Sequence, residues 1–291
     1  MREVTKVLAA TDGTGHGRAA VVTGATLAER AGATFEVATV VEVLLLPPSP
    51  PGVDPRELEP GFVREVREKA AEQASEAGAP DAPLHVRAGL APKLVNKIAD
   101  DTGADLIVLG ASPQPARARS LVGATGRRIL YLADRPVLVA NSARREPFKR
   151  VLAAVDLSEE SGPVLESAWA VAKAEGAQMR ALFVVEPLPM MLAKVVRQKE
   201  DERHQQGRQE LERILEGASL GSEVEPRVRD GAAGEMILEE AQDWDADLIV
   251  LGTHGFGFFD RLMLGSTSLY VLRHGHRATM VVPPTPQRHA S

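Results

Sequence analysis

The chain contains no cysteine and few aromatic residues: among 291 residues there are two Trp, two Tyr and seven Phe. The absence of cysteine excludes disulfides and thiolate chemistry. Low aromatic content predicts cores built from Val, Leu, Ile and Ala, which suit parallel sheets. The longest apolar stretch, residues 37–46, is interrupted by Glu42 and is too short to span a bilayer. With no apolar signal region after the Met-Arg-Glu start, we expect a cytoplasmic protein without membrane contact.

The chain also lacks an excess of positive charge: it has 34 Lys and Arg against 40 Asp and Glu, so the formal net charge is −6. A nucleic-acid binder needs a basic face for its phosphate contacts, so no nucleic-acid partner is predicted. One local cluster of arginines consists of Arg117, Arg119, Arg127 and Arg128. We interpret these residues as solvated side chains on a loop and a helix. The length favours about two domains of ordinary size.

Several catalytic motifs are missing. The dipeptide Gly-Lys never occurs, so there is no G-x4-G-K-[ST] loop, and neither H-E-x-x-H nor G-x-S-x-G is present. Without a loop lysine, this chain's glycine loop supplies no cation for phosphoryl transfer. His274 and His276 lie close together but lack further ligands in a matching pattern, so a helix-end turn explains them better than a metal site.

The sequence repeats itself. Residues 104–110 recur letter for letter as residues 246–252, an offset of 252 − 110 = 142. Residues 7–12 are similar to residues 151–156, at an offset of 156 − 12 = 144. Internal repetition of this kind predicts two similar domains, which we place at residues 1–146 and 147–291.

Short apolar runs alternate with helical periodicity in each half. In the second half we expect strands at residues 151–155, 179–185, 223–228, 248–251 and 279–282, and helices at residues 162–175, 193–216, 234–243 and 266–274. This alternation predicts right-handed βαβ units and a parallel sheet with helices on both faces. Asp156, Val185 and Gly252 then lie at the carboxyl ends of strands, where such sheets bind ligands.

A glycine loop with the spacing G-x2-G-x9-G-S joins the expected strand at 248–251 to the helix at 266–274. Gly252 and Gly255 let the chain turn sharply, and Gly265 lets the backbone approach phosphate oxygens. Ser266 is a good helix N-cap whose hydroxyl can donate to a phosphate, and Ser268 could add a second hydroxyl. A plain connection between strand and helix is the alternative interpretation, but the full spacing favours a nucleotide site.

The repeat and this loop resemble the universal stress protein family in its tandem, two-domain form. The resemblance implies an α/β fold of two open, parallel-sheet, Rossmann-like domains packed as a pseudo-two-fold pair. It also implies binding of ATP, or of ADP or AMP, with Mg²⁺ accompanying the phosphates. Residues 137–140 and 279–282 resemble the family's dimer-forming edge strands, so a homodimer is expected.

The resemblance also assigns roles within the site. Asp156 matches the family's aspartate beside the nucleoside, and capping of the following helix is the alternative interpretation. Val185 matches the family position whose main-chain N–H and C=O recognise the adenine edge. His254 is interpreted as part of the loop structure rather than as a catalytic group. The predicted nucleotide-binding residues are Ala154, Asp156, Val185, Gly252, His254, Gly255, Gly265, Ser266, Thr267 and Ser268.

The first half departs from this pattern where phosphates would bind. Pro113 replaces the second glycine of the loop, and Ala124 replaces the serine. Proline lacks an N–H and alanine lacks a hydroxyl, although Thr125 and Arg117 or Arg119 are candidates to compensate. We expect a weakened or empty site on an intact fold, with counterparts at Asp12, Val41, Gly110, Gly123 and Thr125.

Three functions compete at this stage. The first is a nonenzymatic, nucleotide-binding stress or regulatory protein that acts on an unknown protein partner. The second is a slow ATP hydrolase or phosphotransferase that uses Asp156 or His254. The third is a scaffold in which nucleotide is incidental. The resemblance implies the first, no catalytic residue is assigned, and any turnover is expected to fall well below about 10 per second.

Overall fold

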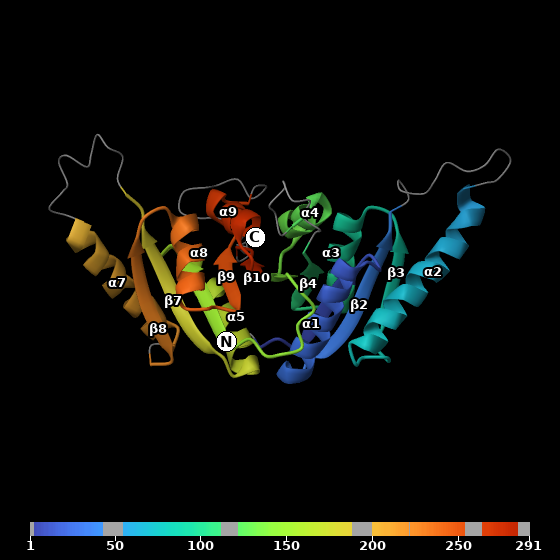
Figure 1. Cartoon of the computed structure of the whole chain (residues 1–291), viewed down its shortest axis with the longest axis horizontal. Coiled ribbons are helices and arrows are strands. Elements are labelled where there is room, and N and C mark those ends of the chain that lie inside the picture. The colour runs from blue at the N-terminus through green and yellow to red at the C-terminus, as the bar shows by residue number, and fades with distance from the viewer. Residues whose placement is uncertain are drawn as a thin grey trace, which may run out of the picture. The chain divides into compact units, whose positions relative to one another are not determined.

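The chain is described here by a computed structural model that covers residues 3–42, 55–111, 122–187, 200–220, 222–253 and 264–284. It divides into two compact units (Figure 1). The first half is Val4–Glu146, and the second half contains Pro147–Ser291.

The first half is an open α/β domain. Its strands pair in parallel in the order β3-β2-β1-β4-β5. Helices α1 and α2 contact each other, as do α3 and α4, so one helix pair covers each face, as right-handed crossovers require. The elements are β1 (Lys6–Thr11), α1 (Gly15–Ala31), β2 (Thr34–Val41), α2 (Pro55–Glu76), β3 (Leu84–Ala88), α3 (Ala91–Thr102), β4 (Leu106–Gly110), α4 (Ala124–Leu132) and β5 (Val137–Ala140).

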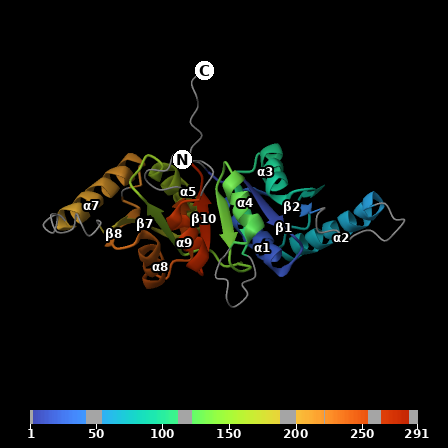
Figure 2. The ribbon, with the colours of Figure 1, turned by 90° about the horizontal axis from the view of Figure 1, so that it is seen from above.

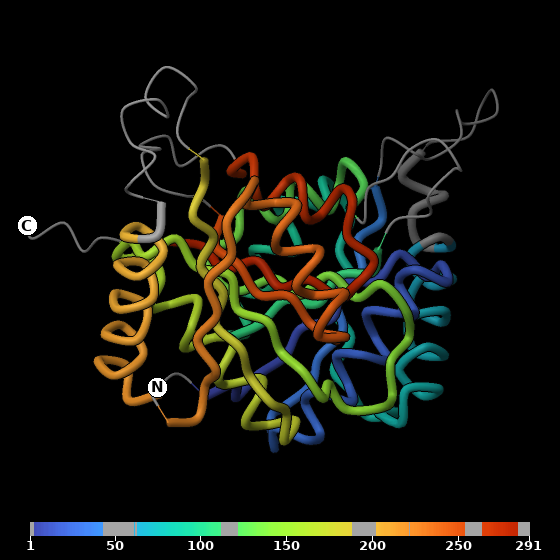
Figure 3. The backbone as a smooth tube through the Cα atoms, turned by 60° about the vertical axis from the view of Figure 1, so that its left-hand side comes forward, coloured from blue at the N-terminus to red at the C-terminus, as the bar shows by residue number. Residues whose placement is uncertain are grey.

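The second half repeats this design, with parallel strands in the order β8-β7-β6-β9-β10. Helices α8 and α9 cover one face and α5 and α7 the other (Figure 2). The long helix α7 runs alongside β8 (Figure 3). The elements are β6 (Arg150–Val155), α5 (Ser161–Glu175), β7 (Gln178–Val185), α7 (Glu200–Gly217), β8 (Val224–Asp230), α8 (Ala233–Asp243), β9 (Leu248–Gly252), α9 (Ser266–His274) and β10 (Ala278–Val282).

The predicted fold class of two tandem, parallel-sheet α/β domains is therefore confirmed. All the elements expected in the second half are present, and their ends lie within two residues of the prediction except at the helix expected at 193–216. That helix is α7, and residues 193–199 lie outside the described residues. The pseudo-two-fold packing of the two domains stays a prediction.

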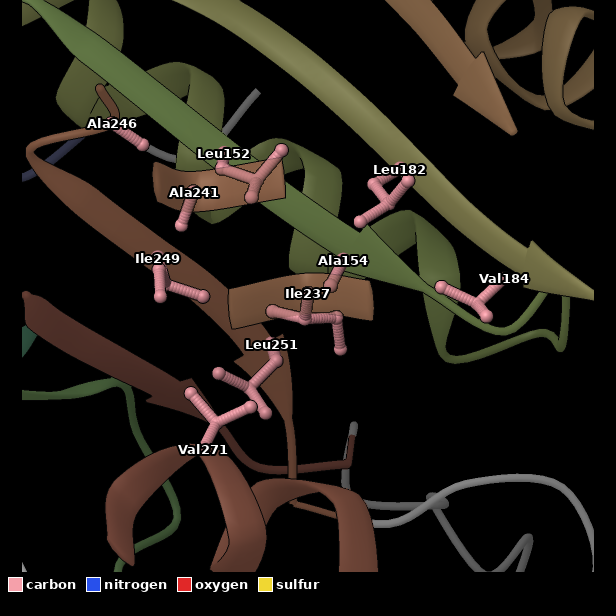
Figure 4. Packing of buried hydrophobic residues seen from close by; sticks show 10 residues of the cluster. All are labelled: Leu152, Ala154, Leu182, Val184, Ile237, Ala241, Ala246, Ile249, Leu251 and Val271. Carbon is pink, nitrogen blue, oxygen red and sulfur yellow. The ribbon is translucent and has the colours of Figure 1, made fainter. Parts of the chain in front are cut away.

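The core between the second-half sheet and helices α8 and α9 consists of aliphatic side chains (Figure 4). Side chains two residues apart on a strand share a face, so β6 contributes Leu152 and Ala154, while β7 contributes Leu182 and Val184. Ile249 is fully buried beside them. The low aromatic content thus correctly indicates a core of Leu, Ile, Val and Ala.

The aspartate inside the repeated segment has the same structural task in each half. Oδ2 of Asp105 accepts hydrogen bonds from the N–H groups of Thr5 and Lys6, each at 2.9 Å. Oδ2 of Asp247 accepts from the N–H groups of Lys149 and Arg150 at 2.7 and 3.1 Å. In both halves the carboxylate joins the start of the central strand to the start of its neighbour, which explains why this position recurs in the repeat.

Replacing Asp247 by Ala should lower the free energy of unfolding by about 2 kcal/mol, because two backbone N–H groups lose a charged acceptor. Both tryptophans, Trp169 and Trp244, lie in the second half, so their fluorescence during urea unfolding reports the change. The control is Glu239→Ala, which removes a carboxylate 3.6 Å from Arg229 and should alter stability by less than about 0.5 kcal/mol. Equal effects of the two substitutions would contradict the role given to Asp247.

Candidate functional site

A cavity of about 350 Å³ lies at the carboxyl ends of β6, β7 and β9 in the second half. Strand order reverses between β6 and β9, and open α/β sheets bind ligands beyond this point. The apolar wall comprises Ala154, Val155, Val164, Leu182, Phe183, Val184, Ala233, Ile237 and Leu251. The remaining lining residues are Asp156, Glu160, Ser161, Glu186, Gly252, Gly265, Ser266, Thr267 and Ser268. Apolar walls with a few polar groups are typical of small-molecule sites.

The structure brings most of the predicted site residues together around this cavity. They are Ala154, Asp156, Gly252, Gly265, Ser266, Thr267 and Ser268. Val185 is not among the described lining residues, and its carbonyl accepts a hydrogen bond from the N–H of Gly231 at 3.1 Å. Its neighbour Val184 lines the cavity instead. His254 and Gly255 lie outside the described residues.

Asp156 directly follows β6, and its two carboxylate oxygens differ sharply. Oδ1 accepts hydrogen bonds from the N–H and hydroxyl of Ser158 at 3.0 and 2.6 Å and from the hydroxyl of Ser161 at 3.3 Å. Oδ2 is buried and has no partner within the part of the chain that the structure describes. A buried polar atom without a partner costs free energy, so a hydrogen-bond donor on a ligand would stabilise this site.

The alternative interpretation, that Asp156 caps the following helix, does not describe the geometry. The N-cap position of α5 is Glu160, and no side chain makes a capping hydrogen bond there. Asp156 instead closes the turn between β6 and α5, in which Leu157 has a φ of 62°. This left-handed conformation favours glycine, and the first-half counterpart is Gly13, with a φ of 77°. Leu157 therefore holds a strained conformation beside the cavity, as residues at functional sites often do.

The start of α9 also differs from the sequence prediction. Gly265 is the N-cap residue and Ser266 is the first helical residue, with no capping hydrogen bond from a side chain. The N–H of Gly265 donates to the carbonyl of Thr253 at 2.6 Å, which fixes the helix start against the end of β9. The Ser268 hydroxyl donates to the carbonyl of Gly252 at 2.6 Å, so it is engaged by the protein rather than left for a phosphate.

The first turn of α9 retains free donors. Among the described residues, the N–H groups of Ser266, Thr267 and Ser268 have no hydrogen-bond partner. Together with the positive end of the helix dipole, such N–H groups bind anions. The charged side chains in the described lining are the carboxylates of Asp156, Glu160 and Glu186. The site can therefore hold an anionic group at α9 and accept hydrogen bonds elsewhere.

In the first half, the end of β4 packs directly against the start of α1. A Cβ atom placed on Gly110 would lie 1.8 Å from the carbonyl oxygen of His16, so the end of β4 contacts the start of α1 directly. Helix α4 begins after Gly123 without a capping side chain, and Thr125 is exposed. Asp12 is also exposed, and its Oδ1 accepts from the N–H and hydroxyl of Thr14.

A buried glutamine adds a connection that the sequence analysis missed. Gln73 of α2 accepts a hydrogen bond from the Thr11 hydroxyl at 2.6 Å and donates to the carbonyl of Thr14 at 2.9 Å. It therefore ties α2 to the turn after β1. At the position of Thr11 the second half has Val155, which lines the cavity. The carbonyl of Val41 accepts from Gly89 at 2.9 Å, in the same way that Val185 accepts from Gly231.

The fold and the site together define a two-domain, open α/β protein with a cavity at the switch point of its second sheet. The sequence profile of the universal stress protein family matches residues 3–141 and again residues 147–283, so the chain belongs to the Universal stress protein family. Within the described residues, no helix is long and apolar enough to cross a membrane.

Individual proteins agree with this assignment. A universal stress protein from Synechocystis is 26% identical over 151 residues, which cover 46% of this chain and 97% of the relative. One from Mycobacterium bovis is 26% identical over 194 residues, covering 64% of this chain and 66% of the relative. The crystal structure of a universal stress protein from Archaeoglobus fulgidus has a TM-score of 0.70 at 21% identity and covers 96% of this chain and 98% of its own. This structural similarity shows that the chain shares its fold with the Archaeoglobus fulgidus protein.

Proposed function

We propose that the second half binds one adenine nucleotide, ATP, ADP or AMP, and that the protein is a nonenzymatic regulator. The observation that carries this proposal is the pairing, around one cavity, of an unpartnered acceptor with unpartnered donors. The acceptor is Oδ2 of Asp156, and the donors are the N–H groups at the start of α9. A ribose hydroxyl would donate to Oδ2 of Asp156, and a phosphate would accept from the N–H groups of α9.

Strand order supports one direction for the proposed nucleotide. The strands β9, β6 and β7 are neighbours in the sheet. β9 leads to α9, β6 leads to Asp156, and β7 carries Val184 near its end. Phosphate oxygens accept from the first turn of α9, and ribose hydroxyls donate to Asp156. The base then packs against the apolar side chains at the end of β7 and the start of α8. Mg²⁺ would enter with the phosphates.

Binding without rapid turnover fits the groups present. No Lys or Arg belongs to the lining as far as the structure describes it, and phosphoryl transfer relies on a cation at the transferred group. Oδ1 of Asp156 is occupied by Ser158 and Ser161. Occupancy of the site would then bias an interaction with a protein partner.

Mass spectrometry of small molecules released from the purified, denatured protein tests the proposal. We expect an adenine nucleotide at close to one molecule per chain, or stoichiometric uptake when ATP is added to protein that has been stripped of ligand. A protein that releases no nucleotide and takes up none on titration does not have the proposed function.

Replacing Asp156 by Asn should weaken ATP binding by about ten- to a hundredfold, because a hydrogen bond to a charged acceptor is lost. The thermal unfolding midpoint should change little, since the remaining amide oxygen can still accept from Ser158. Fluorescence titration with a labelled ATP analogue measures the effect. Asp12→Asn is the matched control in the first half and should leave affinity unchanged, whereas equal losses from both variants would refute the assignment.

A further inference from the structure

Glu186 lines the proposed nucleotide cavity on the side of β7. It follows β7, which is separated from β9 by β6 in the sheet order. Glu186 is exposed and lines the nucleotide cavity together with Ala233 and Ile237 of α8. If the phosphates lie at α9 and the ribose at Asp156, Glu186 is the charged residue beside the base.

The backbone at this end of β7 is held from two sides. The Arg203 guanidinium of α7 donates to the carbonyl of Glu186 at 3.0 Å, and the N–H of Gly231 donates to the carbonyl of Val185 at 3.1 Å. Gly231 has a φ of +146°, and a Cβ there would lie 2.9 Å from Cγ of Met236. The position therefore requires glycine, and Glu186 extends from a fixed point of the sheet.

The Glu186 carboxylate has one engaged oxygen and one free oxygen. Oε1 accepts a hydrogen bond from the N–H of Ala233, the first residue of α8, at 3.3 Å. The positive end of the α8 dipole favours the charged carboxylate at this place. Oε2 has no hydrogen-bond partner among the residues that the structure describes. An ionised carboxylate only accepts hydrogen bonds, so its complement on a ligand must be a donor.

We propose that Glu186 determines base specificity by accepting a hydrogen bond from the exocyclic 6-amino group of adenine. This inference rests on the proposed nucleotide-binding function and assigns its base selectivity to one side chain. Hypoxanthine carries an oxygen at the same position, and that oxygen would turn lone pairs toward the carboxylate. The repulsion rejects the 6-oxo base, in addition to the lost hydrogen bond.

Isothermal titration of the full chain with ATP, ITP and GTP tests this proposal. ATP should bind about ten- to a hundredfold more tightly than ITP, the value of one hydrogen bond to a charged group. In Glu186→Gln the amide oxygen keeps the N–H of Ala233, so the amide NH2 takes the place of Oε2. This group donates to a 6-oxygen but cannot accept from a 6-amino group, so the ATP-to-ITP ratio should fall to one or below. Glu160→Gln removes another carboxylate of the same lining and should change both affinities by the same factor.

The outcomes separate this inference from the proposed function. Tight ATP binding with an ATP-to-ITP ratio near one in the unmodified protein overturns the role of Glu186 but leaves nucleotide binding in place. An unchanged ratio in Glu186→Gln, or GTP binding as tight as ATP binding, also overturns it. Failure of all three nucleotides to bind removes the proposed function itself. The unmodified protein's ratio decides the matter even if Glu186→Gln does not fold.

Discussion

Nucleotide binding is expected to disappear when Gly265 is replaced by Val and Ser266 by Ala in one chain. Gly265 is the N-cap residue of α9 and lines the cavity, so a branched side chain there would occupy the place where a phosphate meets the helix. Its φ of −60° suits any residue, so the backbone itself tolerates valine. The loss of phosphate contacts should weaken binding by more than about a hundredfold.

Equilibrium dialysis against radiolabelled ATP measures this loss, and circular dichroism establishes that unfolding stays cooperative. The control is the pair Gly123→Val and Thr125→Ala at the corresponding helix start of the first half, where Ala124 already stands at the position of Ser266. This control should bind ATP as tightly as the unmodified chain. If the control loses binding and the Gly265 variant keeps it, the nucleotide has been placed in the wrong half.

The largest loss of stability is expected from Gly110→Ala. The added Cβ would lie 1.8 Å from the carbonyl oxygen of His16 and 2.4 Å from its carbonyl carbon, so two backbone segments must separate. Overpacking against a well-packed interior costs about 3 kcal/mol at its upper range. Because the contact lies in the first half, the change should appear as earlier unfolding of that half.

Gly15→Ala is the control for this experiment. Gly15 begins α1, and a Cβ there meets nothing within 4 Å. Its substitution should leave stability unchanged or raise it slightly, because alanine favours helix over glycine. Differential scanning calorimetry compares the two variants. A Gly110→Ala protein as stable as Gly15→Ala would show that β4 and α1 do not meet as closely as the structure indicates.

Much of the fold could be predicted because its signals are local. Apolar runs such as Leu248–Leu251 and the alternation with helices define the strands, and repetition of the segment ending at Gly252 defines two domains. The expected helix at 266–274 coincides with α9, since Ser266 begins its polar first turn. The clustering of Asp156 and Gly252 followed from their places at strand ends, which parallel sheets bring to one edge.

The missed features depend on contacts between distant residues. Gln73 forms a hydrogen bond with Thr11, which lies 62 positions away in the sequence, and no local pattern indicates that contact. Sequence alone also could not show that the carbonyl of Val185, which the resemblance assigns to the adenine edge, accepts a hydrogen bond from the N–H of Gly231. Nor could it show that Ser268 would donate to Gly252, which removes its hydroxyl from the phosphate site.

We propose that each chain binds one adenine nucleotide, in the cavity of its second half. Calorimetric titration of the full, ligand-free chain with ATP in the presence of Mg²⁺ tests it most directly. We expect a single strong site per chain, which the Gly265→Val and Ser266→Ala pair removes. Two equal sites per chain, or a strong site that survives this pair of substitutions, would contradict the claim.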